Sequence, residues 1–180
     1  QVRSVLPDDL MDQVRSFGLY VYNSNGQLER TAASDGTKVT VNLNRSMSYT
    51  VYALANFPVL PEAPFEESEF KSMVHSVPYD LMKDTGVPMC GMISLDAETI
   101  VSGSAEIELV RLITRVSFSI DKSELTSSDL TVTSVKLCQT ASAAAPFSDS
   151  FTPEDDMVEA EGDYVSEDEL DYLNAGGSVW

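Results

Sequence analysis

The sequence predicts an all-β protein, a β-sandwich with one short crossover helix. Apolar and polar residues alternate over several short segments, which is the pattern of half-buried strands. Turn-forming residues such as Asn25-Gly26 separate these segments, and only one segment has helical spacing. The chain has 180 residues, 43% of them hydrophobic, which is enough for one domain with a buried core.

The N-terminal part predicts a lead-in and three strands. Residues 1–13 lack a sustained period and are expected to be irregular. Residues 17–22 alternate with apolar side chains on both faces, which predicts a strand covered on both sides. The runs 39–43 and 49–55 also alternate and are separated by a turn at 44–47. These two runs are therefore predicted to form an antiparallel hairpin.

The one helix is predicted over about 66–77. Four apolar residues fall at helical spacing (Phe70, Met73, Val74 and Val77), and three acids occupy the first turn, where the helix dipole favours negative charge. Prolines bracket the segment as stiff linkers. The helix is expected to cross over an end or edge of the sandwich, and a short strand is expected next, over 90–95.

Ser104–Ile120 is predicted to be the central pair of the sandwich. Its first half places apolar side chains at odd positions, and its second half places them at even positions. Because a slip of one residue turns a strand's apolar side chains to the wrong face, the change near Val110 to Thr114 requires a bulge, a bend or a turn. The stretch is either a tight hairpin or one strand that bends from sheet to sheet.

The last part of the chain differs in composition. One more strand is expected over 130–137. An Ala/Ser run, an acidic segment and a Gly-containing end follow. We expect residues 1–165 to form the sandwich domain, with an acidic loop at about 146–165. Residues 166–180 are expected to be a linker toward a second domain that lies outside this chain.

The charge excludes several classes of partner. The net charge is −18, and the last 44 residues hold 11 acids without a Lys or Arg. So acidic a surface repels nucleic acid and anionic membranes. No apolar run approaches the length of a transmembrane helix. No signal-peptide pattern is present, which predicts a chain that is cytosolic or already processed, and the start at Gln1 without Met favours a mature or engineered start. Cys90 and Cys138 form either one disulfide or two buried free thiols.

The residue inventory predicts no enzyme, cofactor or metal site. His75 is the single histidine, so a Ser-His-Asp, Cys-His or multi-histidine site cannot be built, and we expect it to be structural and half-exposed on the helix. The acidic residues 154–163 lack the spacing of a calcium loop and are expected to be solvated. Glu106 and Glu108 share the solvent side of a strand rather than forming a glycosidase pair.

Five motifs in order resemble the fimbrillin family, the subunits of type V pili in Bacteroides-like bacteria. They are LYVYNSNGQL, SYTVYALANF, VPMCGMISL, IELVRLITRVSFSI and DELDYLNAGGSV. The resemblance implies a transthyretin-like β-sandwich, made as a lipoprotein and attached to the outer membrane as a precursor. It further implies that an arginine-specific protease removes an N-terminal segment, and that the exposed groove accepts a strand from the next subunit.

The resemblance places proteolytic processing between Arg3 and Ser4. Arg15 and Arg30, which are expected to lie on exposed loops, are the other candidate positions, and cleavage after Arg30 would release the strand that contains Leu19. The implied partners are other pilin subunits, the arginine-specific protease and host proteins or glycans. The resulting hypothesis is a shaft or tip subunit of a cell-surface fimbria. A glycan- or protein-binding surface module that does not polymerise is the alternative, and a hydrolase using the acidic residues is a third hypothesis.

Overall fold

The computed structural model describes residues 13–76, 79–113, 118–121, 131–135, 140–141, 143–148, 157–158, 167–176 and 178–179. The chain divides into two compact units. The sheet unit comprises Leu6–Ile113 and Ala143–Thr152, and the small unit comprises Gln1–Val5, Thr114–Ser142 and Pro153–Trp180. The predicted domain boundary near residue 165 stays a prediction.

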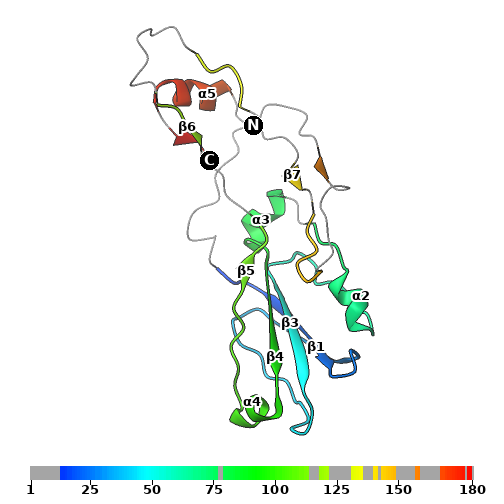
Figure 1. Cartoon of the computed structure of the whole chain (residues 1–180). Helices are drawn as coiled ribbons and strands as arrows, with labels where there is room; N and C mark the ends of the chain where they lie inside the picture. The colour runs from blue at the N-terminus through cyan, green and yellow to red at the C-terminus, as the bar shows by residue number, and fades with distance from the viewer. Residues whose placement is uncertain are drawn as a thin grey trace. The chain divides into compact units, whose positions relative to one another are not determined.

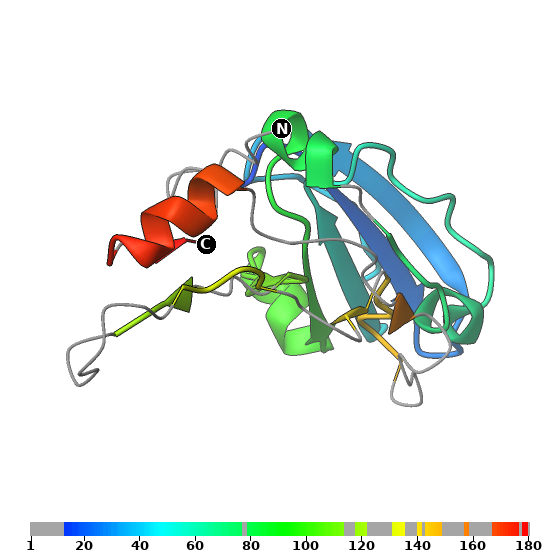
Figure 2. The same ribbon diagram turned by 90° about the horizontal axis from the view of Figure 1, so that it is seen from above.

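A five-stranded antiparallel sheet forms the sheet unit (Figure 1). The strands lie in the order β2-β1-β3-β4-β5. Their bounds are β1 Phe17–Asn23, β2 Leu28–Ser34, β3 Tyr49–Ala55, β4 Met89–Leu95 and β5 Val110–Arg111. Figure 2 shows the sheet from above as one twisted layer. With a few short helices around it, this mostly antiparallel sheet confirms the predicted all-β class.

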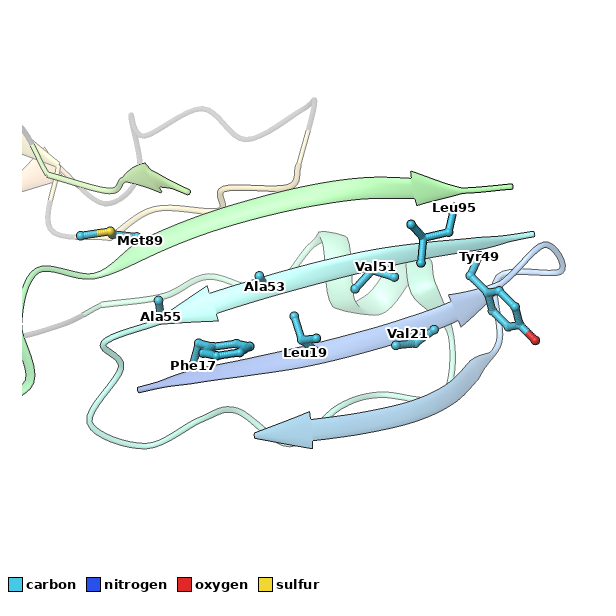
Figure 3. Close-up of a cluster of buried hydrophobic side chains, with 9 residues drawn as sticks. All are labelled: Phe17, Leu19, Val21, Tyr49, Val51, Ala53, Ala55, Met89 and Leu95. Carbon is cyan, nitrogen blue, oxygen red and sulfur yellow. The ribbon is translucent and has the colours of Figure 1, made fainter. Parts of the chain in front are cut away.

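Both faces of the sheet are covered. Odd-numbered side chains of β1, β3 and β4 form the odd face, where Phe17, Val21 and Val51 belong to one buried cluster (Figure 3). Even-numbered side chains form the even face, where Tyr22, Tyr52 and others make a second cluster. Every residue of β1 is consequently buried. This confirms the predicted strand over 17–22 with apolar residues on both sides, and β4 confirms the strand expected over 90–95.

The predicted hairpin of 39–43 with 49–55 is wrong. Strand β3 is hydrogen-bonded to β1 on one side and to β4 on the other, which leaves no free edge. The residues 38–44 form no strand. Val39, Leu43 and Met47 instead pack against the odd-face cluster. The alternation therefore reflects a segment that covers the sheet rather than one that pairs within it.

The predicted helix over 66–77 is shorter than expected. Helix α2 spans Glu67–Lys71 and ends at Ser72. Phe70 and Met73 pack on the even face, as the helical spacing predicted, but Val74 is 52% exposed. His75 is not helical, because its backbone forms an isolated bridge with Ala144. Val77 lies outside the described residues.

Three further short helices were not predicted. They are α3 Tyr79–Thr85, α4 Ala97–Ser102 and α5 Glu167–Asn174. The side chain of Asp96 caps α4 by accepting a 2.8 Å hydrogen bond from the Thr99 N–H, and Gly103 ends the helix at φ 82°. No helix within the described ranges is long and apolar enough to span a membrane.

The stretch Ser104–Ile120 is not a central pair. Its first half leads to β5 at one edge of the sheet, where Ile107 and Leu109 pack on the odd face as the pattern predicted. Its second half contains β6, Phe118–Ser119, which pairs with β9, Ser178–Val179, in the small unit. The two halves belong to different units, so neither predicted arrangement holds, and residues 114–117 lie outside the described residues.

The small unit gathers around Leu173 of α5, which is fully buried. The Asn174 side-chain amide donates to the Val132 carbonyl and accepts from the Val132 N–H, both at 2.9 Å. Residues 131–135 form no strand, which corrects the expectation for 130–137 where the structure describes it. A second small pair joins β7, Thr140–Ala141, to β8, Met157–Val158.

Candidate functional site

The predicted processing site, Arg3 and Ser4, lies outside the described residues and stays a prediction. The acidic segment 154–163 lies outside them as well, except for Met157 and Val158 in β8. The structure describes both alternative arginines and the two edges of the sheet.

Arg15 holds the N-terminal side of the sheet against helix α3. Its side-chain NH1 group donates to the Asp84 carbonyl at 2.7 Å and to the Lys83 carbonyl at 3.3 Å. Carbonyls at a helix C-terminus lack partners within the helix, and a cation there is favoured by the helix dipole. Its main-chain N–H donates to Asn56 Oδ1 at 2.8 Å. Arg15 is therefore a structural clamp rather than a residue on a free loop.

Arg30 lies within strand β2, where its backbone is in register with Val21. Its side chain is exposed. Cleavage after Arg30 would require the strand to leave the sheet, because proteases cut chain that has opened locally. Neither alternative arginine thus matches the accessible loop that the sequence suggested.

Strand β2 forms one open edge of the sheet. It is seven residues long and pairs with β1 on one side. On its other side, the Leu28 N–H donates to the Phe65 carbonyl at 2.8 Å, next to a bond from the Glu67 N–H to the Gly26 carbonyl. Beyond that point, residues 29–34 have no backbone partner on this side among the described residues.

At the opposite edge of the sheet, the short strand β5 and the segment before it cover β4. Strand β5 pairs with Met89 and Cys90 of β4. Just beyond, a Cβ atom placed on Gly91 would collide with the Glu108 carbonyl oxygen and with the Ile107 side chain. The segment leading to β5 therefore lies directly against β4, and only glycine permits so close an approach. Of the two edges, β2 is the one that presents a regular strand.

Aromatic rings pack the even face around Phe70. The Phe70 ring lies 4.6 Å from Tyr20, 5.6 Å from Tyr22, 5.2 Å from Tyr52 and 5.7 Å from Phe147, measured between centroids. Such offset and tilted arrangements are the favoured geometries of aromatic pairs. This cluster fixes α2 on the sheet and thereby orients the segment that borders the start of β2.

Three tyrosine hydroxyls fasten the segment 58–67 to the even face. Tyr20 donates to the Pro61 carbonyl and Tyr22 to the Pro64 carbonyl, both at 2.9 Å, while Tyr52 donates to Glu67 Oε1 at 2.6 Å. Burial raises the pKa of Tyr20 to about 12. Burial, followed by the charge of Glu67, raises the pKa of Tyr22 to about 12. Both hydroxyls therefore remain protonated donors at neutral pH.

An open hollow of about 370 Å³ lies beside this segment. It is lined by Glu62, Ala63, Pro64, Glu69 and Met73. The lining combines two carboxylates with apolar surface and contains no hydroxyl, thiol or imidazole nucleophile. The hollow could receive a side chain of a partner, but its residues do not make a catalytic set.

The remaining acidic, thiol and imidazole candidates that the structure describes do not line this hollow. Glu106 and Glu108 are both exposed, as their solvent-side positions predicted. Within the described ranges, no three or more His, Cys, Asp or Glu residues gather to hold a metal ion. Cys90 is a buried free thiol whose pKa is raised by burial, and Cys138 lies outside the described residues. His75 lies in the bridge to Ala144 and not on a helix, while its side chain is partly exposed as predicted. Its Nε2 atom is buried and has no hydrogen-bond partner among the described residues.

The geometry defines a class of protein: a β-sheet protein with both faces packed and one regular edge strand. No family model matches the chain. No curated protein matches it either. A solved structure similar to part of it is a putative cell adhesion protein from Bacteroides eggerthii, with 13% sequence identity and a TM-score of 0.37. The match covers 45% of this chain and 28% of that protein's chain.

Proposed function

We propose that this chain is a structural subunit, a shaft or tip pilin, of a cell-surface fimbria that assembles by protease-triggered strand exchange. In this proposal the chain is not an enzyme and binds no cofactor. Its precursor is a lipoprotein attached to the outer membrane. Its partners are other pilin subunits and an arginine-specific protease, and host proteins or glycans can bind the finished filament.

The edge strand β2 is the observation that carries the proposal. Its outer side offers backbone N–H and C=O groups over residues 29–34. Such an edge is a template for a strand from another chain, because the added strand completes a ladder of hydrogen bonds. An added strand with side chains on both sheet faces buries on the order of 1,000 Å², the size of a stable interface.

The positions of three of the motifs that resemble fimbrillins support the same proposal. LYVYNSNGQL forms β1 and the turn into β2, SYTVYALANF forms β3, and VPMCGMISL forms β4. These three motifs build the sheet next to the β2 edge. The resemblance therefore concerns the part of the chain on which strand addition depends.

Polymerisation can be tested with cells that express the whole gene. The isolated protein is treated with an arginine-specific protease and analysed on an unheated SDS gel, where strand-exchanged polymers form ladders. Arg3→Lys is expected to abolish the ladder, because such a protease does not cut after lysine. The matched control Arg30→Lys, at an exposed side chain, is expected to ladder normally. A ladder that persists in Arg3→Lys, or disappears in Arg30→Lys, contradicts processing at Arg3.

A pair of neighbouring proline substitutions tests the edge itself. Of Thr31 and Ala32 in β2, one N–H points toward β1 and the other points outward. Proline removes the N–H, and an edge strand tolerates it only at the outward position. The variant that keeps the wild-type circular dichroism and melting temperature is expected to lose the ladder. Normal laddering by that folded variant would exclude β2 as the acceptor.

The alternative, a monomeric glycan- or protein-binding module, predicts a different set of results. No ladder forms with any protease, and the uncut monomer binds glycans on an array. Because these results and the ladder exclude each other, one preparation of the protein distinguishes the two functions.

A further inference from the structure

A short segment from a distant part of the sequence covers the even face. Residues 143–148, here called the strap, belong to the piece Ala143–Thr152 of the sheet unit, although Thr114–Ser142 before this piece and Pro153–Trp180 after it belong to the small unit. The strap inserts Phe147, whose ring centroid lies 4.8 Å from that of Tyr52 and 5.7 Å from that of Phe70. Phe147 is 8% exposed, so the strap forms part of the core.

One pair of backbone hydrogen bonds joins the strap to the segment after α2. The His75 N–H donates to the Ala144 carbonyl at 2.7 Å, and the Ala144 N–H donates to the His75 carbonyl at 2.8 Å. Ala145 of the strap is also buried. Docking of the strap therefore involves this bridge and the burial of Ala145 and Phe147.

The imidazole beside this bridge has an unusual environment. Its Nε2 atom is buried and has no hydrogen-bond partner in the described part of the chain, and its ring meets Phe57 edge-on with the centroids 5.4 Å apart. Three segments meet at this point, namely 55–58, 72–76 and the strap, and none of them contains a charged residue. The charged residues nearest to these segments along the chain are Lys71 before His75, Asp80 after it, and Asp149, which directly follows the strap and lies outside the described residues.

Protonation is costly in such a place. A buried charge without a partner is strongly disfavoured, and burial accordingly lowers the pKa of His75 from 6.5. Because the strap is bonded to the backbone of His75, its release is expected to open this segment to solvent and to return the pKa of the imidazole toward 6.5. The docked state is therefore fully favoured above pH 6.5, and its stability decreases as the pH falls from 6.5 through the lowered pKa.

We infer that His75 is an acid-sensitive latch: the neutral imidazole keeps the strap docked, and its protonation releases the strap and uncovers Tyr52 and Phe70. The two states differ in the contacts of one short segment, which include the bridge and the burial of Ala145 and Phe147, and this makes local opening possible without unfolding the central strands β1 and β3.

Hydrogen exchange on the whole chain tests the latch. After correction for intrinsic exchange rates, the protection of the Ala144 amide is expected to fall about tenfold or more between about pH 7.5 and pH 5, the opening expected of a two-state element. The Tyr52 amide in β3 is expected to keep its protection. In His75→Phe, which keeps an aromatic ring but cannot bind a proton, the protection of Ala144 is expected not to depend on pH. An unchanged Ala144 amide in the wild type, or the same fall in His75→Phe, overturns the inference.

A second measurement needs no variant. His75 is the only histidine of the chain, so its imidazole C–H signals in a proton NMR spectrum require no assignment. The inference predicts that His75 titrates below 6.5 and that the Ala144 and Phe147 signals change over the same pH range. A titration at or above 6.5, or strap signals that do not follow it, contradicts the latch.

Discussion

The side chain of Asn56 fills the space that Gly86 leaves empty. A Cβ atom on Gly86 would lie 2.8 Å from Asn56 Nδ2, closer than real side chains approach one another. Asn56 has a left-handed backbone at φ 63°, and it is fully buried. The left-handed residue interrupts the alternation of β3. As a result Phe57 packs on the even face, although its odd number would place it on the other side.

Asn56 joins three segments through its side-chain amide. The Oδ1 atom accepts from the Arg15 N–H, and Nδ2 donates to the Gln13 and Val87 carbonyls, each at 2.8 Å. Asn56→Ala leaves buried groups without partners and places alanine in a left-handed conformation. We expect a loss of about 2 to 4 kcal/mol in the free energy of unfolding, measured by urea denaturation.

The control for this change is Asn25→Ala. Asn25 is exposed and has a negative φ. Its substitution is expected to change stability by less than about 0.5 kcal/mol. Equal effects of the two substitutions would show that the buried amide is not a structural junction.

Gly86 and Gly103 form a matched pair for the contact with Asn56. Both are left-handed, at φ 87° and 82°, but no atom lies within 4 Å of a Cβ on Gly103. Gly103→Ala is expected to cost only the backbone penalty of about 1 kcal/mol, whereas Gly86→Ala adds the collision and is expected to cost about 3 kcal/mol. Thermal or urea unfolding of both variants provides the comparison. Similar losses in the two variants would mean that Asn56 moves aside without cost.

Phe70 is expected to be the most sensitive residue of the even face. It is fully buried and contacts four other aromatic rings, so Phe70→Ala should lower the free energy of unfolding by about 3 to 5 kcal/mol. Phe65, five positions earlier, is 58% exposed. Phe65→Ala should therefore cost less than about 1 kcal/mol. Urea denaturation followed by circular dichroism measures both, and a small effect at Phe70 would refute the packing of α2 on the sheet.

The buried tyrosines predict instability in alkali. The pKa values of Tyr20 and Tyr22 are raised from 10.0 to about 12 in the folded chain. The two protonated hydroxyls contribute fully to the free energy of unfolding below pH 10. This free energy falls as the pH rises from 10 toward 12, because the tyrosines of the unfolded chain ionise more readily than the buried ones.

Absorbance of tyrosinate near 295 nm and unfolding curves at several alkaline pH values follow this effect. Tyr20→Phe and Tyr22→Phe should each lose a hydroxyl bond worth about 1 kcal/mol at neutral pH. Each variant should also lose less stability than the wild type between pH 10 and pH 12. Tyr172, which is 59% exposed, serves as the control, and Tyr172→Phe should alter neither. If the alkaline decrease is unchanged in both buried variants, the two hydroxyls are not buried as described.

The sequence predicts the faces of strands well, because alternation is a local property. Leu19 and Tyr20 lie on opposite faces as expected. Alternation does not reveal what a strand pairs with, however. Val39 and Leu43 alternate because they cover the sheet, and the same pattern was interpreted as a paired strand.

The end of helix α2 depends on a contact with a segment that is distant in the sequence. Residues after Ser72 have helical spacing, but the backbone of His75 bonds to Ala144, far along the chain. Helix α4 could have been predicted, because Asp96 and Gly103 are standard start and stop signals in the sequence.

The candidate site was only partly predictable for the same reason. The sequence predicts Arg15 as a candidate cleavage position, since nothing nearby in the sequence indicates that Lys83 and Asp84 supply the carbonyls that it binds. That β2 is an edge strand follows from the order of all five strands, which no single segment encodes.

Hydrogen exchange of β2 before and after assembly tests the central claim most directly. In the monomer the outward amides of residues 29–34 are expected to exchange quickly, and in the protease-assembled polymer to become protected about a hundredfold or more, as in a ladder paired on both sides. Assembly that leaves the β2 amides unchanged while protecting another segment would contradict strand addition at this edge.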